Sequence, residues 1–333
     1  MRNTVWILAI LLSVRSWGAT FVLPTANTSL LDPARQEQFF VGTIGRPWTS
    51  GQFGCVRSEG RKFHEGLDIR SLSRDRRGEP TDPVMASADG TVAYLSTRAG
   101  LSNYGIYLVL RHQIEGLEVY TLYAHLSSVR KGLRVGDSVR AGEVVATMGR
   151  TTNTREGISK DRAHLHFEID LVANGRYAAW HASKLKGIRN DHGNFNGRNL
   201  LGIDPAAIFR EQSRLGAGFR LVQFLQSRPV LARVAVRGAK PAWVRRYPQL
   251  LVRNPVAERE GVAGYEFALA FNGLPIRITP RSARELPGTG KVQLLEVNAA
   301  ELSQHPCGKM VFKRGQAWTL LPKGQELVDL ITY

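Results

Sequence analysis

Apolar and polar residues alternate in short runs along the first half of the chain, which is the pattern of β-strands with one buried face. Gly, Asn and Asp residues separate these runs, as expected for turns. The clearest predicted strands are residues 90–96 (GTVAYLS), 104–112 (YGIYLVLRH) and 117–126 (LEVYTLYAHL), with a hairpin loop at residues 112–116. This many short strands predicts an all-β sandwich or a barrel-like core.

Two later stretches continue the β pattern. Residues 135–149 (VGDSVRAGEVVATMG) predict two short strands joined by a turn. Residues 164–180 (HLHFEIDLVANGRYAAW) begin with strict alternation, and the pair Asn174-Gly175 within them predicts a type I′ hairpin.

The hydrophobic period changes at residues 202–214 (GIDPAAIFREQSR), where we predict a helix. Asp204 is suited to cap the first turn, and Pro205 fits the first helical position. We expect this helix to close the first domain, which we place at residues 51–214, after a lead-in segment at residues 20–50.

The remaining residues, 215–333, form a predicted second domain of mixed character. Their apolar segments are compatible with strands or a short helix, and Asn272-Gly273 predicts another hairpin turn. The segments are residues 218–226 (GFRLVQFLQ), 264–280 (GYEFALAFNGLPIRITP) and 291–299 (KVQLLEVNA).

The first 19 residues have the layout of a secretory signal peptide. Arg2 precedes a short apolar core at residues 5–14, and the small residues Gly18 and Ala19 follow it. The core is too short to cross a bilayer as a helix. We therefore predict an exported protein, located in the periplasm or the extracellular cell wall, with no transmembrane span in the mature chain.

The chain contains two cysteines, Cys55 and Cys307. In an oxidising compartment they would form one disulfide that joins the start of the chain to its end, or remain two buried thiols. The sequence does not choose between these alternatives. Two distant cysteines without close partners argue against a cysteine-based zinc site.

The net charge is +17, and residues 212–333 hold 18 Lys and Arg against 8 Asp and Glu. A basic surface favours anionic partners. We find no nucleic-acid-binding motif and expect no nucleic-acid partner. The predicted partner of the basic C-terminal domain is an anionic polymer of the cell envelope; the alternative is a solvated surface without a specific partner.

Residues 63–70 (FHEGLDIR) supply a first candidate site. His64 and Asp68 offer nitrogen and oxygen ligands of the kind that zinc accepts. The helical H-E-x-x-H motif does not apply, because the fifth position is Asp68 and Gly66 makes a helix unfavourable. If these residues bind a metal, they do so from a strand or its end.

Residues 162–171 (RAHLHFEIDL) supply a second candidate site. His164 and His166 are two residues apart on a predicted strand and therefore project from one face. A metal ion would favour this arrangement, because it binds neutral imidazole nitrogen. A pair of half-exposed structural histidines is the alternative. His125, in LYAHLSS at residues 122–128, lies near the end of another predicted strand.

Taken together, the three histidine-containing stretches resemble the lysostaphin-like, or LytM-type, zinc metallopeptidases that cleave peptidoglycan peptides. The resemblance covers roughly residues 50–172. It implies that His64, Asp68 and His166 bind Zn²⁺, and that His125 and His164 are the catalytic pair beside the metal. Position and spacing alone do not decide which of His164 and His166 is the ligand.

The resemblance implies a mainly β protein with an antiparallel sandwich or barrel-like hydrolase core and an open groove. The smaller mixed α+β domain that follows is predicted from the apolar segments of residues 215–333 alone. It also implies a zinc endopeptidase that cuts peptidoglycan cross-links or stem peptides. The main alternative is a catalytically silent binding module of the same fold that activates another cell-wall hydrolase. A lipoyl-type carrier is disfavoured because Arg140, Ala141 and Gly142, rather than a lysine, stand near the tip of the 135–149 hairpin.

Overall fold

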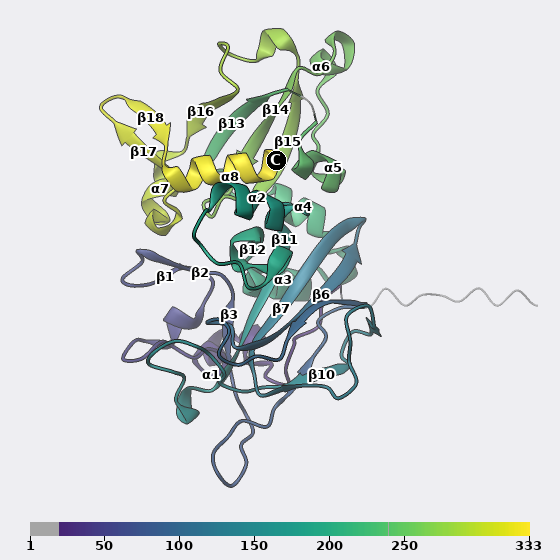
Figure 1. Cartoon of the computed structure of the whole chain (residues 1–333), viewed down its shortest axis with the longest axis vertical. Helices are drawn as coiled ribbons and strands as arrows, with labels where there is room; N and C mark the ends of the chain where they lie inside the picture. The colour runs from purple at the N-terminus through teal and green to yellow at the C-terminus, as the bar shows by residue number, and fades with distance from the viewer. Residues whose placement is uncertain (1–19, 239) are drawn as a thin grey trace, which may run out of the picture.

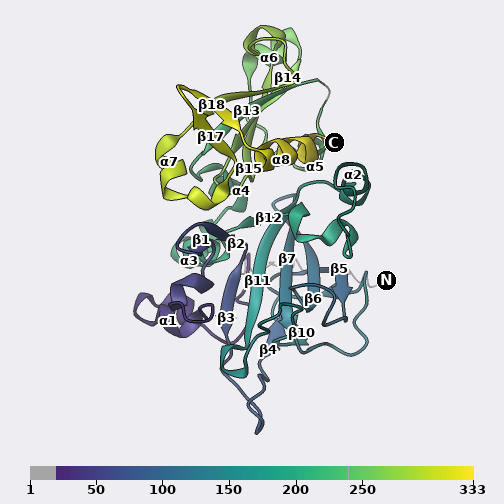
Figure 2. The same cartoon turned by 60° about the vertical axis from the view of Figure 1, so that its left-hand side comes forward.

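The computed structural model describes residues 20–238 and 240–333. The predicted signal peptide, residues 1–19, lies outside them. Figures 1 and 2 show two parts arranged along the long axis: a β-rich N-terminal half and a C-terminal region with a smaller sheet and most of the helices. Within the described residues, no helix combines the length and apolar character needed to cross a bilayer.

A seven-stranded antiparallel sheet forms the frame of the N-terminal half. The strand order is β12-β11-β7-β6-β5-β9, and β3 pairs with β11 beside β12. The strands are β3 (Leu67–Arg70), β5 (Gly90–Ser96), β6 (Ile106–Ile114), β7 (Leu117–Leu126), β9 (Ser138–Val139), β11 (His164–Val172) and β12 (Leu200–Ile203).

The predicted strands at residues 90–96 and 117–126 have the bounds of β5 and β7, and the segment at 104–112 is β6 shifted by two residues. Glu115 and Gly116, both with positive φ, form the turn between β6 and β7. The positive φ angles match the strand twist, which is why a two-residue turn suffices.

Two smaller sheets complete the N-terminal half, and the described strands form no closed barrel. One sheet has the order β4-β10-β8, with bounds Pro83–Met85, Val144–Thr147 and Ser128–Val129. The other is a separate hairpin of β1 (Gly54–Arg57) and β2 (Lys62–His64). The segment 135–149 does hold two short strands, β9 and β10, but each pairs with a strand of a different sheet.

The lead-in segment is part of the hydrophobic core. Phe39, at the end of α1 (Gln36–Phe39), and the adjacent Phe40 are fully buried, and Phe40 forms a β-bridge with Ile69 of β3. Phe21 exchanges two hydrogen bonds with the Gln212 side chain. The lead-in therefore packs as a structural element of the N-terminal half.

The predicted hairpin at Asn174-Gly175 is wrong, because a helix, α2 (Tyr177–Lys184), follows this turn. The Asn174 side-chain oxygen accepts the backbone N–H of Arg176, and its amide donates to the carbonyl of Leu330. These two bonds direct the chain out of β11 and into the helix. The contact with Leu330 comes from the far end of the chain, which local sequence patterns do not reveal.

The helix predicted at residues 202–214 is confirmed as α3 (Pro205–Leu215). The Asp204 carboxylate accepts the backbone N–H groups of Ala206 and Ala207, and Pro205 occupies the first turn. The cap and the proline thus begin the helix as the sequence predicts.

The C-terminal region is a mixed α+β structure. Its main sheet has the order β15-β14-β13-β16, and β17 and β18 form a separate ribbon. The predicted turn at Asn272-Gly273 is confirmed, and the undecided segment 218–226 contains a helix. The elements are α4 (Leu221–Gln226), β13 (Ala232–Arg237), α5 (Ala242–Arg246), α6 (Pro255–Glu260), β14 (Gly264–Leu269), β15 (Pro275–Arg281), β16 (Val292–Val297), α7 (Ala299–Gln304), β17 (Val311–Arg314), β18 (Ala317–Leu320) and α8 (Pro322–Thr332).

A disulfide joins Cys55 of β1 to Cys307, with a Cα–Cα distance of 5.4 Å. Of the two alternatives that the sequence left open, the structure contains the disulfide. It connects the hairpin β1–β2 to the C-terminal region across a sequence separation of 252 residues.

Candidate metal centre

All nine residues of β11 are buried, although alternate positions are polar. Four of its apolar residues belong to the main hydrophobic core on one side of the sheet: Leu165, Phe167, Ile169 and Leu171. The polar face carries, in order, His164, His166, Glu168 and Asp170. Because side chains two apart share a strand face, this row is the direct result of the alternation in the sequence.

Strand pairing brings Asp68 to this row. Within the β3–β11 pair, Asp68 lies opposite His166. Side chains directly opposite in antiparallel strands have their Cβ atoms about 5 Å apart, so one short side chain reaches the other. The pairing register of β3 and β11, which are about 100 residues apart in sequence, thus places Asp68 beside His166.

His64 is the last residue of β2, and the two-residue link Glu65-Gly66 leads from it into β3. A Cβ atom at Gly66 would meet the carbonyl oxygen of Phe167 and lie 2.9 Å from Cγ of Glu168. Only glycine permits this close approach to β11. The local structure is therefore strand, turn and strand, which agrees with the rejection of a helical zinc motif.

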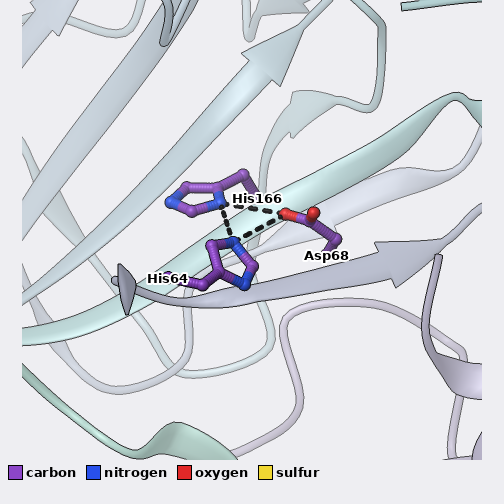
Figure 3. A group of neighbouring side chains, drawn as sticks. All are labelled: His64, Asp68 and His166. Atoms are coloured by element: carbon purple, nitrogen blue, oxygen red, sulfur yellow. Dashed lines mark hydrogen bonds and ion pairs between the residues drawn. The ribbon is translucent and has the colours of Figure 1, made fainter. Parts of the chain in front are cut away.

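Figure 3 shows that His64, Asp68 and His166 point toward one another. The His64 Nε2 atom lies 3.1 Å from His166 Nδ1 and 3.2 Å from Asp68 Oδ1, and the latter two atoms are 3.0 Å apart. Ligand atoms about 2.0–2.1 Å from a tetrahedral zinc ion are roughly 3.3 Å from each other. The triangle of donor atoms therefore has the size that a zinc ion requires.

In their neutral forms, the two imidazoles have outward hydrogen bonds that leave their inward nitrogens as acceptors. His64 Nδ1 donates to the Gln52 carbonyl at 2.7 Å, and His166 Nε2 donates to the Glu168 carboxylate at 2.7 Å. With these protons facing outward, two lone pairs and a carboxylate oxygen converge on one buried point. Such a set of acceptors is stable around a cation, and its outer hydrogen bonds are those expected of metal-binding histidines.

The charge of Asp68 is balanced from several sides. Burial by itself raises the pKa of Asp68, but the nearby histidines and Arg57 outweigh it and hold the pKa well below its usual range. Arg57 donates to the second oxygen, Oδ2, at 2.6 Å. This leaves Oδ1 as the atom that faces His64 and His166.

His166 lies between two carboxylates. Burial lowers its pKa, but the hydrogen bonds to Asp68 and Glu168 outweigh burial and raise the pKa to about 10 in the absence of a metal. A positive charge at this point is thus electrostatically favoured. Binding of a cation would replace the proton on Nδ1, so metal binding and proton release are coupled.

His125 and His164 lie beside the triangle, with their ring centroids 5.0 Å apart. His125 Nδ1 donates to the Thr151 carbonyl, and His164 Nδ1 donates to the Arg162 carbonyl. Both Nε2 atoms are left as acceptors, and that of His164 lies 3.5 Å from Asp68 Oδ1.

The environment keeps these two imidazoles neutral. Burial, followed by the neighbouring His164 and His166, lowers the pKa of His125 well below its ordinary value. Burial also lowers the pKa of His164, although Asp68 partly offsets this effect. His125 has a backbone φ of +60°, which residues other than glycine rarely adopt. Such backbone conformations are concentrated at functional sites.

A groove of about 990 Å³ opens over the site. His125, His164 and His166 line it, together with residues of the loop at 152–158. Asn272 and Lys323 of the C-terminal region line it as well. Both parts of the molecule therefore form the walls of this groove.

The structure brings together all five residues that the sequence singled out, and it adds two that sequence reasoning missed. Glu168 could have been found, because it continues the polar face two residues after His166. Arg57 gave no usable signal, because its contact with Asp68 depends on how the β1–β2 hairpin packs.

Part of this chain is similar to known peptidases. Residues 62–178 match peptidase family M23, and no curated protein matches the chain. Similar solved structures include a zinc-containing peptidase from Vibrio cholerae, with 26% identity over 32% of this chain and 26% of that chain and a TM-score of 0.24. Another is a putative glycyl-glycine endopeptidase LytM from Ruminococcus gnavus, with 24% identity over 45% and 47% and a TM-score of 0.30.

The catalytic domain of lysostaphin from Staphylococcus simulans is also similar, with 20% identity over 52% of this chain and 89% of that chain and a TM-score of 0.28. The present chain covers about a quarter of the Vibrio structure and about half of the Ruminococcus structure. The family match includes the three residues of the donor triangle together with His125 and His164. Residues 62–178 of this chain are therefore similar to peptidase family M23.

Proposed function

We propose that this protein is a zinc-dependent endopeptidase that hydrolyses peptide bonds in peptidoglycan cross-links or stem peptides. The observation that carries the proposal is the buried triangle of His64 Nε2, Asp68 Oδ1 and His166 Nδ1. Two of its members, Asp68 and His166, line the groove. Three protein ligands leave a tetrahedral ion one further position, which is the arrangement of catalytic rather than structural zinc sites.

The ligand set suits zinc rather than a harder cation, because two of its three donors are imidazole nitrogens. A zinc ion bound there supplies Lewis acidity, which polarises a carbonyl group and lowers the pKa of water from 15.7 to about 7. Arg57 and Glu168 orient the ligands from outside, since each bonds to the side of a ligand that faces away from the centre.

The catalytic groups in this proposal are His125 and His164. Their neutral Nε2 atoms are proton acceptors, and their Nδ1–H groups are fixed by backbone carbonyls. One imidazole removes the proton from the attacking water through its Nε2. The other stabilises the negative charge that develops on the scissile carbonyl oxygen once its own Nε2 carries a proton, because only an N–H group can donate to that oxygen. A separate carboxylate base is not needed.

The proposal includes the setting in which the protein works. The N-terminal 19 residues direct export to the periplasm or the cell wall, and the basic C-terminal region binds an anionic polymer of the envelope. The open groove suits an extended peptide, which can form hydrogen bonds along its floor.

The test uses protein that begins at residue 20, purified peptidoglycan, and paired reactions with and without a zinc chelator. Mass analysis of the soluble products identifies the bond that is cut. We expect cross-linked peptides to disappear only in the reaction without chelator. Stoichiometric zinc without any cleavage would contradict the proposal and favour a silent module that activates another hydrolase.

A further inference from the structure

The β1–β2 hairpin, which carries His64, has no strand partner in the rest of the described chain. Asp68 and His166, in contrast, belong to adjacent strands of the seven-stranded sheet. An isolated two-stranded hairpin is only marginally stable in water. The position of His64 relative to the other two residues therefore depends on what packs against the hairpin.

The C-terminal region supplies much of that packing. Phe271 contacts two aromatic rings edge-on: Phe53, the residue before β1, at a centroid distance of 6.2 Å, and Phe63 of β2 at 5.8 Å. His305 stacks on Phe271 at 4.1 Å and fixes it from the C-terminal side. Phe63 is the residue immediately before His64.

The Cys55–Cys307 disulfide attaches the first strand of the hairpin to the same region. Asn272, next to Phe271, donates a hydrogen bond of 2.7 Å to the carbonyl of Gly202 in β12. Since β12 pairs with β11, this bond attaches the C-terminal region to the strand that carries His166. The C-terminal region thus contacts both the β1–β2 hairpin, which carries His64, and β12, which pairs with the strand that carries His166.

We propose that the C-terminal region positions the zinc ligand His64, with Phe271 and the Cys55–Cys307 disulfide as its positioning residues. By holding the β1–β2 hairpin at a fixed distance from the large sheet, the region keeps the His64 nitrogen in the triangle before the metal binds. A site whose ligands are already in place binds its ligand more tightly, because binding does not have to order them. This inference rests on the proposed zinc site.

The test measures zinc affinity of the metal-free full chain by competition with a chromophoric chelator. We expect Phe271→Ala to weaken zinc binding by about 10- to 100-fold, the range found for residues that orient metal ligands. Phe271→Leu, which keeps apolar bulk, should recover part of the loss. Phe312→Ala removes a phenyl ring from β17 of the same region and is the matched control, with wild-type affinity expected.

A second variant, with Cys55→Ser and Cys307→Ser combined, tests the covalent link without changing the aromatic packing. Amide hydrogen exchange should accelerate at residues 54–64 in both variants, while the large sheet keeps its protection. Folded variants of both kinds that bind zinc as tightly as the wild type would overturn the inference.

The outcomes also separate this inference from the proposed function. Wild-type protein that binds zinc and loses affinity in the variants, but cleaves no peptidoglycan, would support the positioning role and contradict the substrate. Wild-type cleavage together with unchanged zinc affinity in the variants would contradict the positioning role alone. Wild-type protein that binds no zinc would contradict both.

Discussion

The two main sheets bury charged residues in opposite ways. In the C-terminal sheet, the buried Glu266 lies between Arg233, whose guanidinium donates at 2.8 Å, and Arg281, whose Nε donates at 3.0 Å. In the N-terminal sheet, Glu168 is bonded to His166, and the fully buried Asp170 next to it has no hydrogen-bond partner for either oxygen.

The contrast lies in how each buried carboxyl group is stabilised. Around Glu266 the two arginines supply enough positive charge, so the group needs nothing from outside. Along β11 no arginine pairs with Asp170, and burial together with the neighbouring Glu168 raises the pKa of Asp170 well above its ordinary value, which favours its neutral, protonated form. An unpaired buried charge is costly and is commonly removed by protonation, so Glu168 keeps a charged partner in His166 while Asp170 is stabilised as the neutral acid.

The largest predicted effect breaks the donor triangle. His166→Ala removes one of the three proposed ligands and should weaken zinc affinity by more than the roughly 100-fold loss seen for residues outside a ligand set. Activity should disappear with the metal. The measurement is zinc content after dialysis, and a variant that keeps one zinc per chain would remove His166 from the ligand set.

His125→Ala should separate metal binding from turnover. The variant should keep its zinc, because His125 is not part of the triangle, while kcat falls by about 10²- to 10⁴-fold, the usual contribution of acid–base catalysis. Steady-state kinetics with a soluble cross-linked peptide, together with zinc analysis of the same sample, test this. An unchanged rate would contradict the catalytic assignment.

Glu168→Gln tests the outer hydrogen bond of His166. The neutral amide is a weaker acceptor, so we expect zinc affinity to fall by about 10- to 100-fold. Glu156→Gln is the control, because Glu156 lines the same groove but is exposed. Equal affinities in the two variants would show that Glu168 does not support the ligand.

The pH dependence of kcat should reflect the neutral histidines. A proton acceptor works in its neutral form, and burial lowers the pKa of His125 and of His164 below 6.5. As pH falls, both therefore stay neutral past pH 6.5, and the acid limb of the profile should lie below that value. Zinc content is measured at each pH, and an acid limb above 6.5 with zinc retained would contradict the assignment.

The smallest expected change in zinc affinity comes from a substitution in the C-terminal sheet. Glu266→Gln leaves Arg233 and Arg281 without their shared carboxylate and should lower the free energy of unfolding by about 1–3 kcal/mol. Zinc affinity should stay at the wild-type value. Chemical denaturation and chelator competition measure the two quantities, and a coupled loss of zinc affinity would show that the two clusters are not independent.

The placement of several site residues followed from local pattern, whereas their roles as ligands or catalytic groups were implied by the family resemblance. The alternation in RAHLHFEIDL was sufficient to place His164 and His166 on one face, because strand geometry leaves no other arrangement. The helical zinc motif was rejected on residue types, because Asp68 stands at its fifth position and Gly66 disfavours a helix. Strands β5 and β7 were predicted with their bounds because each is a continuous alternating run between turns.

The parts that local pattern missed depend on distant contacts. The turn at Asn174 was assigned to a hairpin, but a carbonyl 156 residues away bonds its side chain and a helix follows. Arg57 meets Asp68 only because the hairpin packs against the large sheet. Whether the cysteines pair was undecidable for the same reason, since it requires the relative position of the two halves of the chain.

The Cys55–Cys307 disulfide can form only late in the synthesis of this chain. The two cysteines are separated by 252 residues, and a ribosome adds about 5–20 residues per second, so roughly ten to fifty seconds pass between their syntheses. During that interval the β1–β2 hairpin exists without its covalent attachment. The bond that joins the hairpin to the C-terminal region forms only after residue 307 has been synthesised, and any product that terminates before that residue lacks it.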